Sequence, residues 1–365
     1  MEPLKAAKIR IVEGVEDDAR VTERARRLIE AIECDDVATV DEAGFNELAG
    51  ELIAMPRPRH GMTGEIKPIV ILNLARFGES DEERARRQER YPDVFKLGGL
   101  FSGKSGFTWR PSGSPEHRAK TGWVCQPAWQ IHSIRGCHYR CSYCSLGHFI
   151  NLMMNLEEFV GTLDEEIATH APDQTLFQYD NGTDVPAFEP EYGGSKLMIE
   201  YFAGRPDQFL ELYVGKSANV DFLLDLEHRG HTVCCWSLAG ETQSTYFERV
   251  AASMTERIEA SRKCQEAGYH VRHRFSPFIP VRNWREECTE MIEALFADVK
   301  PDVITFETIR YMGYEAIMRD FDPDLLDPEF VAAMEEVADV KVQNGEEVPM
   351  DYRRGMYRYI IDELE

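Results

Sequence analysis

The chain has 365 residues and nine cysteines, and its 65 acidic and 41 basic residues give a formal net charge of −24. This length allows one large domain with extensions or two ordinary domains. The lack of a signal-peptide pattern and of an 18-residue apolar run predicts a cytoplasmic protein that does not contact a membrane. The strong negative charge repels phosphates and argues against DNA as a partner. In a reducing compartment, nine cysteines favour metal binding or catalysis over a disulfide framework.

Residues 1–120 are predicted to form an N-terminal extension. An acidic helical pattern covers Asp17 to Cys34, and a charged run from Glu79 to Arg90 has the spacing of a solvated helix face. Gly98 to Ser105 fits the phosphate-cradling pattern G-x4-G-K-S, but such a loop requires a helix directly after it. The next residues are rich in Gly, Ser and Pro, so we discount nucleotide binding there.

From Trp129 onward, short apolar or β-branched runs alternate with longer amphipathic ones, which is typical of β-α units around a parallel sheet. The strand candidates are Trp129 to Ile134, Thr175 to Tyr179, Phe209 to Val214, Thr232 to Leu238, His270 to Phe275 and Val303 to Thr308. The helix candidates between them are Leu156 to His170, Ser195 to Phe202, Val220 to His228, Met254 to Glu266 and Trp284 to Phe296. Two more helices are predicted near the C-terminus, from Pro328 to Val342 and from Tyr352 to Leu364.

Six β-α units are too few for a closed eight-stranded barrel. We therefore expect an α/β fold built on a partial (β/α)6 barrel. Its parts are an N-terminal extension (1–120), the barrel core (121–310) and a C-terminal helical segment (311–365). In such parallel sheets ligands bind outside the carboxyl ends of the strands.

Cys137, Cys141 and Cys144 lie within eight residues, in the loop after the first predicted strand. Three thiolates this close can converge on a soft metal centre. A zinc site needs a fourth ligand, which His138 or His148 could supply. A 4Fe-4S cluster held by three thiolates keeps one iron open, where a small molecule can be chelated and reduced.

The spacing C-x3-C-x2-C, with the aromatic Tyr143 before the third cysteine, resembles the radical S-adenosylmethionine (SAM) superfamily. The resemblance implies that the three cysteines hold a 4Fe-4S cluster whose free iron binds SAM. It also implies reductive cleavage of SAM to methionine and a 5'-deoxyadenosyl radical, with a flavodoxin- or ferredoxin-type protein as electron donor. The chain is thus expected to be an enzyme, lyase-like or with another radical chemistry.

Within that superfamily, the sequence from about Ile134 to Met318 is similar to spore photoproduct lyase, a DNA-repair member. The similarity is seen in Val214-Gly215-Lys216, Val220-Asp221-Phe222-Leu223-Leu224-Asp225, Trp236-Ser237-Leu238, Arg257-Ile258-Glu259-Ala260, Ala267-Gly268-Tyr269 and Ile304-Thr305-Phe306-Glu307.

The similarity to the lyase implies that Tyr143 packs beside the cluster and the adenine of SAM. The polar end or ribose of SAM would be bound by Thr183, Lys216 and Ser237. Each of these three lies where a predicted strand ends, and a lysine suits a carboxylate. Asp184 and Glu241 are further polar candidates in the same ring of loops.

The chain departs from that family at the hydrogen donor. Spore photoproduct lyase uses a cysteine on the loop after the second strand, and Asn181 stands in its place here. An amide N–H or C–H bond gives up a hydrogen atom far less readily than a thiol does.

Three hypotheses follow. The first is a radical SAM enzyme that abstracts hydrogen from a small organic or nucleoside-like substrate. The second is a DNA lesion lyase with a relocated donor, such as Tyr179 or a distant cysteine. The third is a non-catalytic zinc-binding module.

Overall fold

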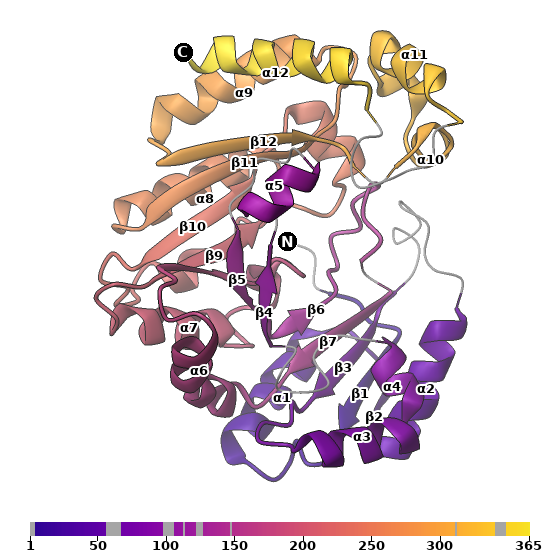
Figure 1. The fold of residues 1–365 in the computed structure, drawn as a ribbon, viewed down its shortest axis with the longest axis vertical. Helices are drawn as coiled ribbons and strands as arrows, with labels where there is room; N and C mark the ends of the chain where they lie inside the picture. Colours follow the sequence, from indigo (N-terminus) through magenta and orange to yellow (C-terminus); the bar gives the residue numbers. More distant parts are fainter. Residues whose placement is uncertain are drawn as a thin grey trace.

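The computed structural model describes residues 4–55, 67–97, 106–111, 114–121, 127–146, 148–310, 312–339 and 348–365. These residues form two β-sheets with helices packed around them, one sheet built mainly from the N-terminal segment and the other from the barrel core (Figure 1).

The N-terminal sheet has five strands in the order β2-β1-β3-β7-β6. Its strands are β1 (Lys8–Val12), β2 (Val37–Val40), β3 (Ile69–Asn73), β6 (Ile134–Arg135) and β7 (Phe149–Met153). All pairs are parallel except β6 with β7. None of these five strands was predicted from the sequence. Because β6 and β7 come from within residues 121–310, the N-terminal sheet is completed by the barrel segment, and the division at residue 120 stays a prediction.

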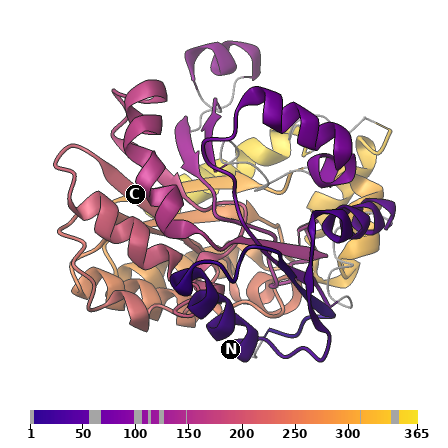
Figure 2. The same cartoon turned by 90° about the horizontal axis from the view of Figure 1, so that it is seen from below.

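Helices cover both faces of the N-terminal sheet, as the view from below in Figure 2 shows. They are α1 (Ala19–Ala31), α2 (Glu42–Ala54), α3 (Asp81–Arg90) and α4 (Pro92–Leu97). Asp18 caps α1, whose apolar stripe joins the main core, whereas α2 and α4 bury theirs in a second, smaller cluster. The predicted helix in Asp17 to Cys34 and the charged helix near Glu79 to Arg90 are confirmed.

The second sheet curls into a half-barrel with the order β12-β11-β10-β9-β8-β5-β4. Six strands are parallel: β5 (Ala128–Ile131), β8 (Leu176–Tyr179), β9 (Phe209–Gly215), β10 (Thr232–Ser237), β11 (His270–Phe278) and β12 (Val303–Thr308). The edge strand β4 (Phe107–Arg110) pairs antiparallel with β5. The six predicted strands and the partial (β/α)6 barrel are therefore confirmed.

The helices between these strands are α6 (Leu156–His170), α7 (Gly194–Ala203), α8 (Met254–Glu266) and α9 (Trp284–Asp298). α5 (Pro115–Thr121) precedes the barrel, and α10 (Tyr314–Asp320), α11 (Pro328–Glu336) and α12 (Met350–Leu364) follow it. The short helical turns are η3 (Val185–Phe188), η4 (Asp221–Leu223), η5 (Gln243–Phe247) and η6 (Pro323–Leu325).

One predicted helix, Val220 to His228, is wrong. The segment holds only the single turn η4, because tertiary contacts take up the groups that a helix would pair. The Leu223 carbonyl accepts a hydrogen bond from the Tyr269 hydroxyl at 2.8 Å, and the His228 ring lies against Tyr269 with 3.8 Å between centroids. Local helical periodicity is a weak preference that such contacts override.

The loop from Gly98 to Ser105 lies outside the described residues. The described chain resumes at Gly106 and enters β4, a strand, where a phosphate-binding loop would need a helix. Among the described residues, no helix combines the length and apolar character needed to cross a bilayer.

Candidate active site

The loop with the three cysteines leaves β6 through Gly136, whose backbone is left-handed at φ +106°. A Cβ at this position would collide with the Phe149 carbonyl of β7, so only glycine allows the loop to pass so closely. The Thr183 hydroxyl donates to the Gly136 carbonyl at 2.6 Å, and the Gly136 N–H donates to the Gly182 carbonyl at 3.2 Å. The loop after β8 thus holds the start of the cysteine loop in place.

The three thiols lie within electrostatic reach of one another, since a thiolate at Cys141 or Cys144 raises the pKa of Cys137, and one at Cys144 raises the pKa of Cys141. Burial is the main cause that raises all three pKa values, to about 12 for Cys141. Without a metal the thiols are therefore neutral at pH 7, and metal loading must release protons. Among the described residues, no three His, Cys, Asp or Glu side chains are arranged to hold a single metal ion, as a zinc site requires.

Lys216 follows β9 directly and lies beside this loop. Its Nζ is 5.6 Å from the centroid of the Tyr143 ring. Burial lowers the pKa of Lys216, but the Glu248 carboxylate and the Cys141 thiol outweigh burial, so the net pKa is raised. Lys216 therefore stays a cation although it is only partly exposed.

Asp184 joins the loop after β8 to the end of β9. Its Oδ2 accepts the backbone N–H of Lys216 at 2.6 Å. Gly215 makes this contact possible: its φ is +67°, and a Cβ there would collide with the Asp184 carboxylate. Burial raises the pKa of Asp184 to about 7, against the opposing effects of the Lys216 N–H and ammonium group.

Glu248, in the loop after β10, is a site residue that sequence reasoning missed. It is 1 % exposed and accepts hydrogen bonds from Tyr143 Oη at 2.5 Å, Gln243 Nε2 at 3.0 Å and Arg257 Nη2 at 2.5 Å. Burial raises the pKa of Glu248, but the charges of Arg257 and Lys216 outweigh it, so the net pKa is lowered. Glu248 is thus a buried anion that fixes Tyr143 beside the cysteines.

Ser237 ends β10 and is buried, with its Oγ 3.0 Å from the Tyr213 hydroxyl. Glu241 is exposed, and it accepts a hydrogen bond from Thr245 of its own loop at 3.1 Å. This hydrogen bond of Glu241 stays within its own loop, whereas Glu248 accepts one from Tyr143 of the cysteine loop.

The loop after β8 is fixed by Asp180, which is fully buried. Its carboxylate accepts the backbone N–H groups of Ser133 at 2.7 Å and Ile134 at 3.0 Å, and it lies 2.8 Å from His132 Nδ1. Asn181 follows Asp180 and is half-buried. Tyr179 is fully buried, with its hydroxyl 2.6 Å from Ser133 Oγ, which does not favour it as a relocated hydrogen donor.

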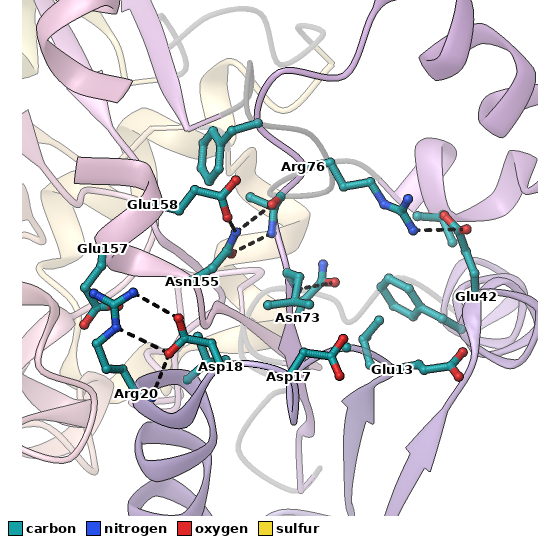
Figure 3. Close-up of a pocket in the computed structure, with 18 of the residues that line it drawn as sticks. Glu13, Asp17, Asp18, Arg20, Glu42, Asn73, Arg76, Asn155, Glu157 and Glu158 are labelled. Atoms are coloured by element: carbon teal, nitrogen blue, oxygen red, sulfur yellow. Dashed lines mark hydrogen bonds and ion pairs between the residues drawn. The ribbon is translucent and has the colours of Figure 1, made fainter. Parts of the chain in front are cut away.

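A separate cavity of about 460 Å³ lies at the carboxyl ends of β1 and β3 in the N-terminal sheet (Figure 3). Its charged walls are largely paired, with Arg76 3.3 Å from Glu42 and Arg20 2.9 Å from Asp18. Carboxylates at helix N-termini also stabilise the helices themselves. None of the site residues predicted from the sequence lines this cavity.

The family model of spore photoproduct lyase matches residues 127–318, the whole segment that carries the cysteine loop and the six parallel strands. The chain belongs to the spore photoproduct lyase family. Spore photoproduct lyase of Bacillus subtilis is 30% identical over 185 residues, covering 48% of this chain and 54% of the relative. That of Clostridium acetobutylicum is 26% identical over 196 residues, covering 52% and 58%. The matches span little more than half the length of these curated relatives.

Solved structures of spore photoproduct lyase share the fold over the whole chain. A mutant with bound AdoMet and dinucleoside spore photoproduct superposes with a TM-score of 0.67 at 16% identity, covering 100% of this chain and 96% of that one. The lyase complexed with dinucleoside spore photoproduct gives 0.64 at 16% identity, with the same coverage. This structural similarity includes the N-terminal sheet, most of which lies outside the residues 127–318 matched by the family model.

Proposed function

We propose that this chain is a radical SAM enzyme in which Cys137, Cys141 and Cys144 hold a 4Fe-4S cluster. The observation that carries the proposal is the meeting of the cysteine loop, which leaves β6 of the N-terminal sheet, with two loops at the carboxyl ends of half-barrel strands. These loops carry Lys216 after β9 and Thr183 after β8. Membership of the spore photoproduct lyase family supports it.

The residues present fit such a cluster, because three soft ligands lie together and the cation of Lys216 lowers the pKa of Cys141 and Cys144. The cluster would supply the electron that cleaves SAM into methionine and a 5'-deoxyadenosyl radical. Lys216 would bind the polar end of SAM, and Glu248 would keep Lys216 charged.

The remaining proposed SAM contacts come from the neighbouring loops. Tyr143 would pack beside the cluster and the adenine, held by Glu248. The Thr183 hydroxyl donates to Gly136, so it keeps its acceptor lone pairs for SAM. Ser237 and Asp184 would complete the ring of polar groups, and a flavodoxin- or ferredoxin-type protein would deliver the electron.

Anaerobic reconstitution tests the proposal against the zinc module. We expect brown protein with four irons and four sulfides, and 5'-deoxyadenosine when SAM and a reductant are added. Alanine at Cys137, Cys141 and Cys144 together should abolish both, whereas Cys34→Ala, outside the loop, should leave both unchanged. Full iron retention in the triple variant, or stoichiometric zinc in place of iron, would contradict it.

For the substrate we propose a small organic or nucleoside-like molecule. The structures of spore photoproduct lyase hold a dinucleoside lesion, which supports the nucleoside-like class. The same structures also support the second candidate, a DNA lesion lyase. They do not support our prediction, based on net charge, that DNA is an unlikely partner. Asn181 at the donor position argues against the lyase reaction itself.

Incubation of reduced enzyme and SAM with dinucleotide spore photoproduct separates the two candidates. We expect no restored thymine from the natural chain, and some from Asn181→Cys if the shared scaffold accepts the lesion. Multiple turnovers to thymine by the natural chain would establish the lyase reading instead. Deuterium in 5'-deoxyadenosine after incubation with cell extract in deuterated water would show that the radical returns after exchange with a substrate.

A further inference from the structure

The concave face of the half-barrel carries a row of polar side chains that come from four of its strands. Gln130 Nε2 of β5 donates to Gln178 of β8 at 3.3 Å, and Gln178 donates to Glu211 of β9 at 2.5 Å. Arg272 of β11 completes the row, 3.3 Å from Glu211. Neighbouring side chains of this row are therefore paired with one another.

One level nearer the carboxyl ends lie Tyr213, Ser237 and Arg274. Ser237 of β10 and Arg274 of β11 are paired across the parallel strands, so their side chains lie on the same face. The Arg274 guanidinium carbon is 5.6 Å from the Tyr213 ring centroid, and the Tyr213 hydroxyl is 3.0 Å from Ser237 Oγ. Arg274 is therefore next to a proposed SAM contact.

Arg274 differs from the other arginines that surround the site. Arg257 pairs with Glu248 at 2.5 Å, Arg272 with Glu211 at 3.3 Å and Arg310 with Glu307 at 2.7 Å. Within the part of the chain that the structure describes, the Arg274 guanidinium makes no hydrogen bond or ion pair. A half-buried guanidinium has five donors and matches carboxylate and phosphate oxygens in a two-pronged geometry.

We propose that Arg274 binds an anionic oxygen group, a phosphate or a carboxylate, of the substrate. The inference rests on the proposed radical SAM function and names its substrate class. The two nearby glutamates are each paired with another arginine, Glu211 with Arg272 and Glu307 with Arg310. An anion that reaches this face would therefore meet one guanidinium of this set, that of Arg274, which has no ion-pair partner among the described residues, and the net charge of −24 of the whole chain does not fix the charge at this place.

The test compares matched pairs of probes that differ in charge, bound to the full chain at equilibrium. One pair is dinucleotide spore photoproduct with its phosphodiester against the dinucleoside without it, and the other is thymidine 5'-carboxylate against thymidine. The protein variants are Arg274→Gln, Arg274→Lys and the control Arg262→Gln, which removes an equal charge from the outer surface of α8. SAM affinity and the yield of 5'-deoxyadenosine are measured on the same samples.

The natural chain is expected to bind the anionic member of one pair about ten-fold or more tightly than the neutral member. The probe pair that shows this difference in affinity identifies the anionic group of the substrate as a phosphate or a carboxylate. Arg274→Gln should remove the preference, Arg274→Lys should keep part of it, and Arg262→Gln should leave it intact, with SAM affinity constant throughout.

Three results would overturn the inference. The first is the lack of any anion preference in the natural chain, and the second is an equal loss of preference in Arg262→Gln. The third is a loss of SAM affinity in Arg274→Gln, which would assign the guanidinium to the carboxylate of SAM. Failure of the proposed function is a different result, because it appears as missing iron or missing 5'-deoxyadenosine while probe binding is still measured.

Discussion

His273 lies on the helix-covered face of β11 and is fully buried. Its ring is stacked 5.9 Å from Trp236, and neither ring nitrogen has a hydrogen-bond partner among the described residues. Burial lowers the pKa of His273 from 6.5 to about 3. Protonation of His273 is therefore less favourable in free energy in the folded chain than in the unfolded chain.

The sign of the effect follows from proton linkage. Below pH 6.5 the unfolded chain binds a proton at this position that the folded chain does not, so stability is full above pH 6.5 and is lost as pH falls toward 3. With pKa values of about 6.5 and 3, the loss at pH 5 is about 2 kcal/mol. His273→Phe keeps an aromatic ring and removes the titration, so it should remove this part of the pH dependence.

The assay is urea unfolding of the metal-free protein, followed by circular dichroism at pH 7.5 and pH 5.0. The natural chain should lose about 2 kcal/mol more than His273→Phe over this interval. His270→Phe, an exposed position on the same strand, is the control and should follow the natural chain. Parallel pH profiles for the natural chain and His273→Phe would refute the reasoning.

Two further predictions concern the end of β9. Lys216→Ala should leave the cluster assembled and weaken SAM binding about ten-fold or more, because a charge-assisted contact worth about 1.5 to 3 kcal/mol is lost. The surface variant Lys263→Ala should change neither cluster assembly nor SAM binding. An unchanged SAM dissociation constant for Lys216→Ala would show that this lysine does not contact SAM. Gly215→Ala should push the Asp184 carboxylate away and cost more in unfolding free energy than Gly230→Ala, which shares a positive φ but meets open space. Equal losses of unfolding free energy in the two glycine variants would show that the close approach of Asp184 to Gly215 does not contribute to stability.

The barrel strands and the cysteine loop could be predicted from the sequence, because apolar runs and cysteine spacing are local signals. The N-terminal sheet could not. Its last full strand, Phe149–Met153, is a five-residue apolar run, and such short runs do not distinguish a strand from a helix. The backbone of this strand lies so close to Gly136 that a side chain there would collide with the Phe149 carbonyl. No local sequence pattern predicts such a contact.

The candidate site shows the same division. Lys216 and Ser237 stand where predicted strands end, so topology alone predicts that they lie near the cysteines. Glu248 is one of 65 acidic residues in a loop without regular spacing, and its importance depends on which cations fold against it. Glu241 had the better position relative to its strand, yet the loop turns it to the surface.

A single buried guanidinium, that of Arg257, connects the end of β10, the loop after it and Lys216. Arg257 donates to the carbonyls of Ala252 at 2.7 Å and Ser237 at 3.0 Å, and it pairs with Glu248. The Ala252 N–H in turn donates to the Lys216 carbonyl at 3.1 Å. The end of β10, the loop after it and the backbone of Lys216 are therefore linked through one fully buried side chain. Because a buried cation without its anion is strongly unfavourable, Glu248 and Arg257 must fold together, and the proposed SAM contacts can form only when they do.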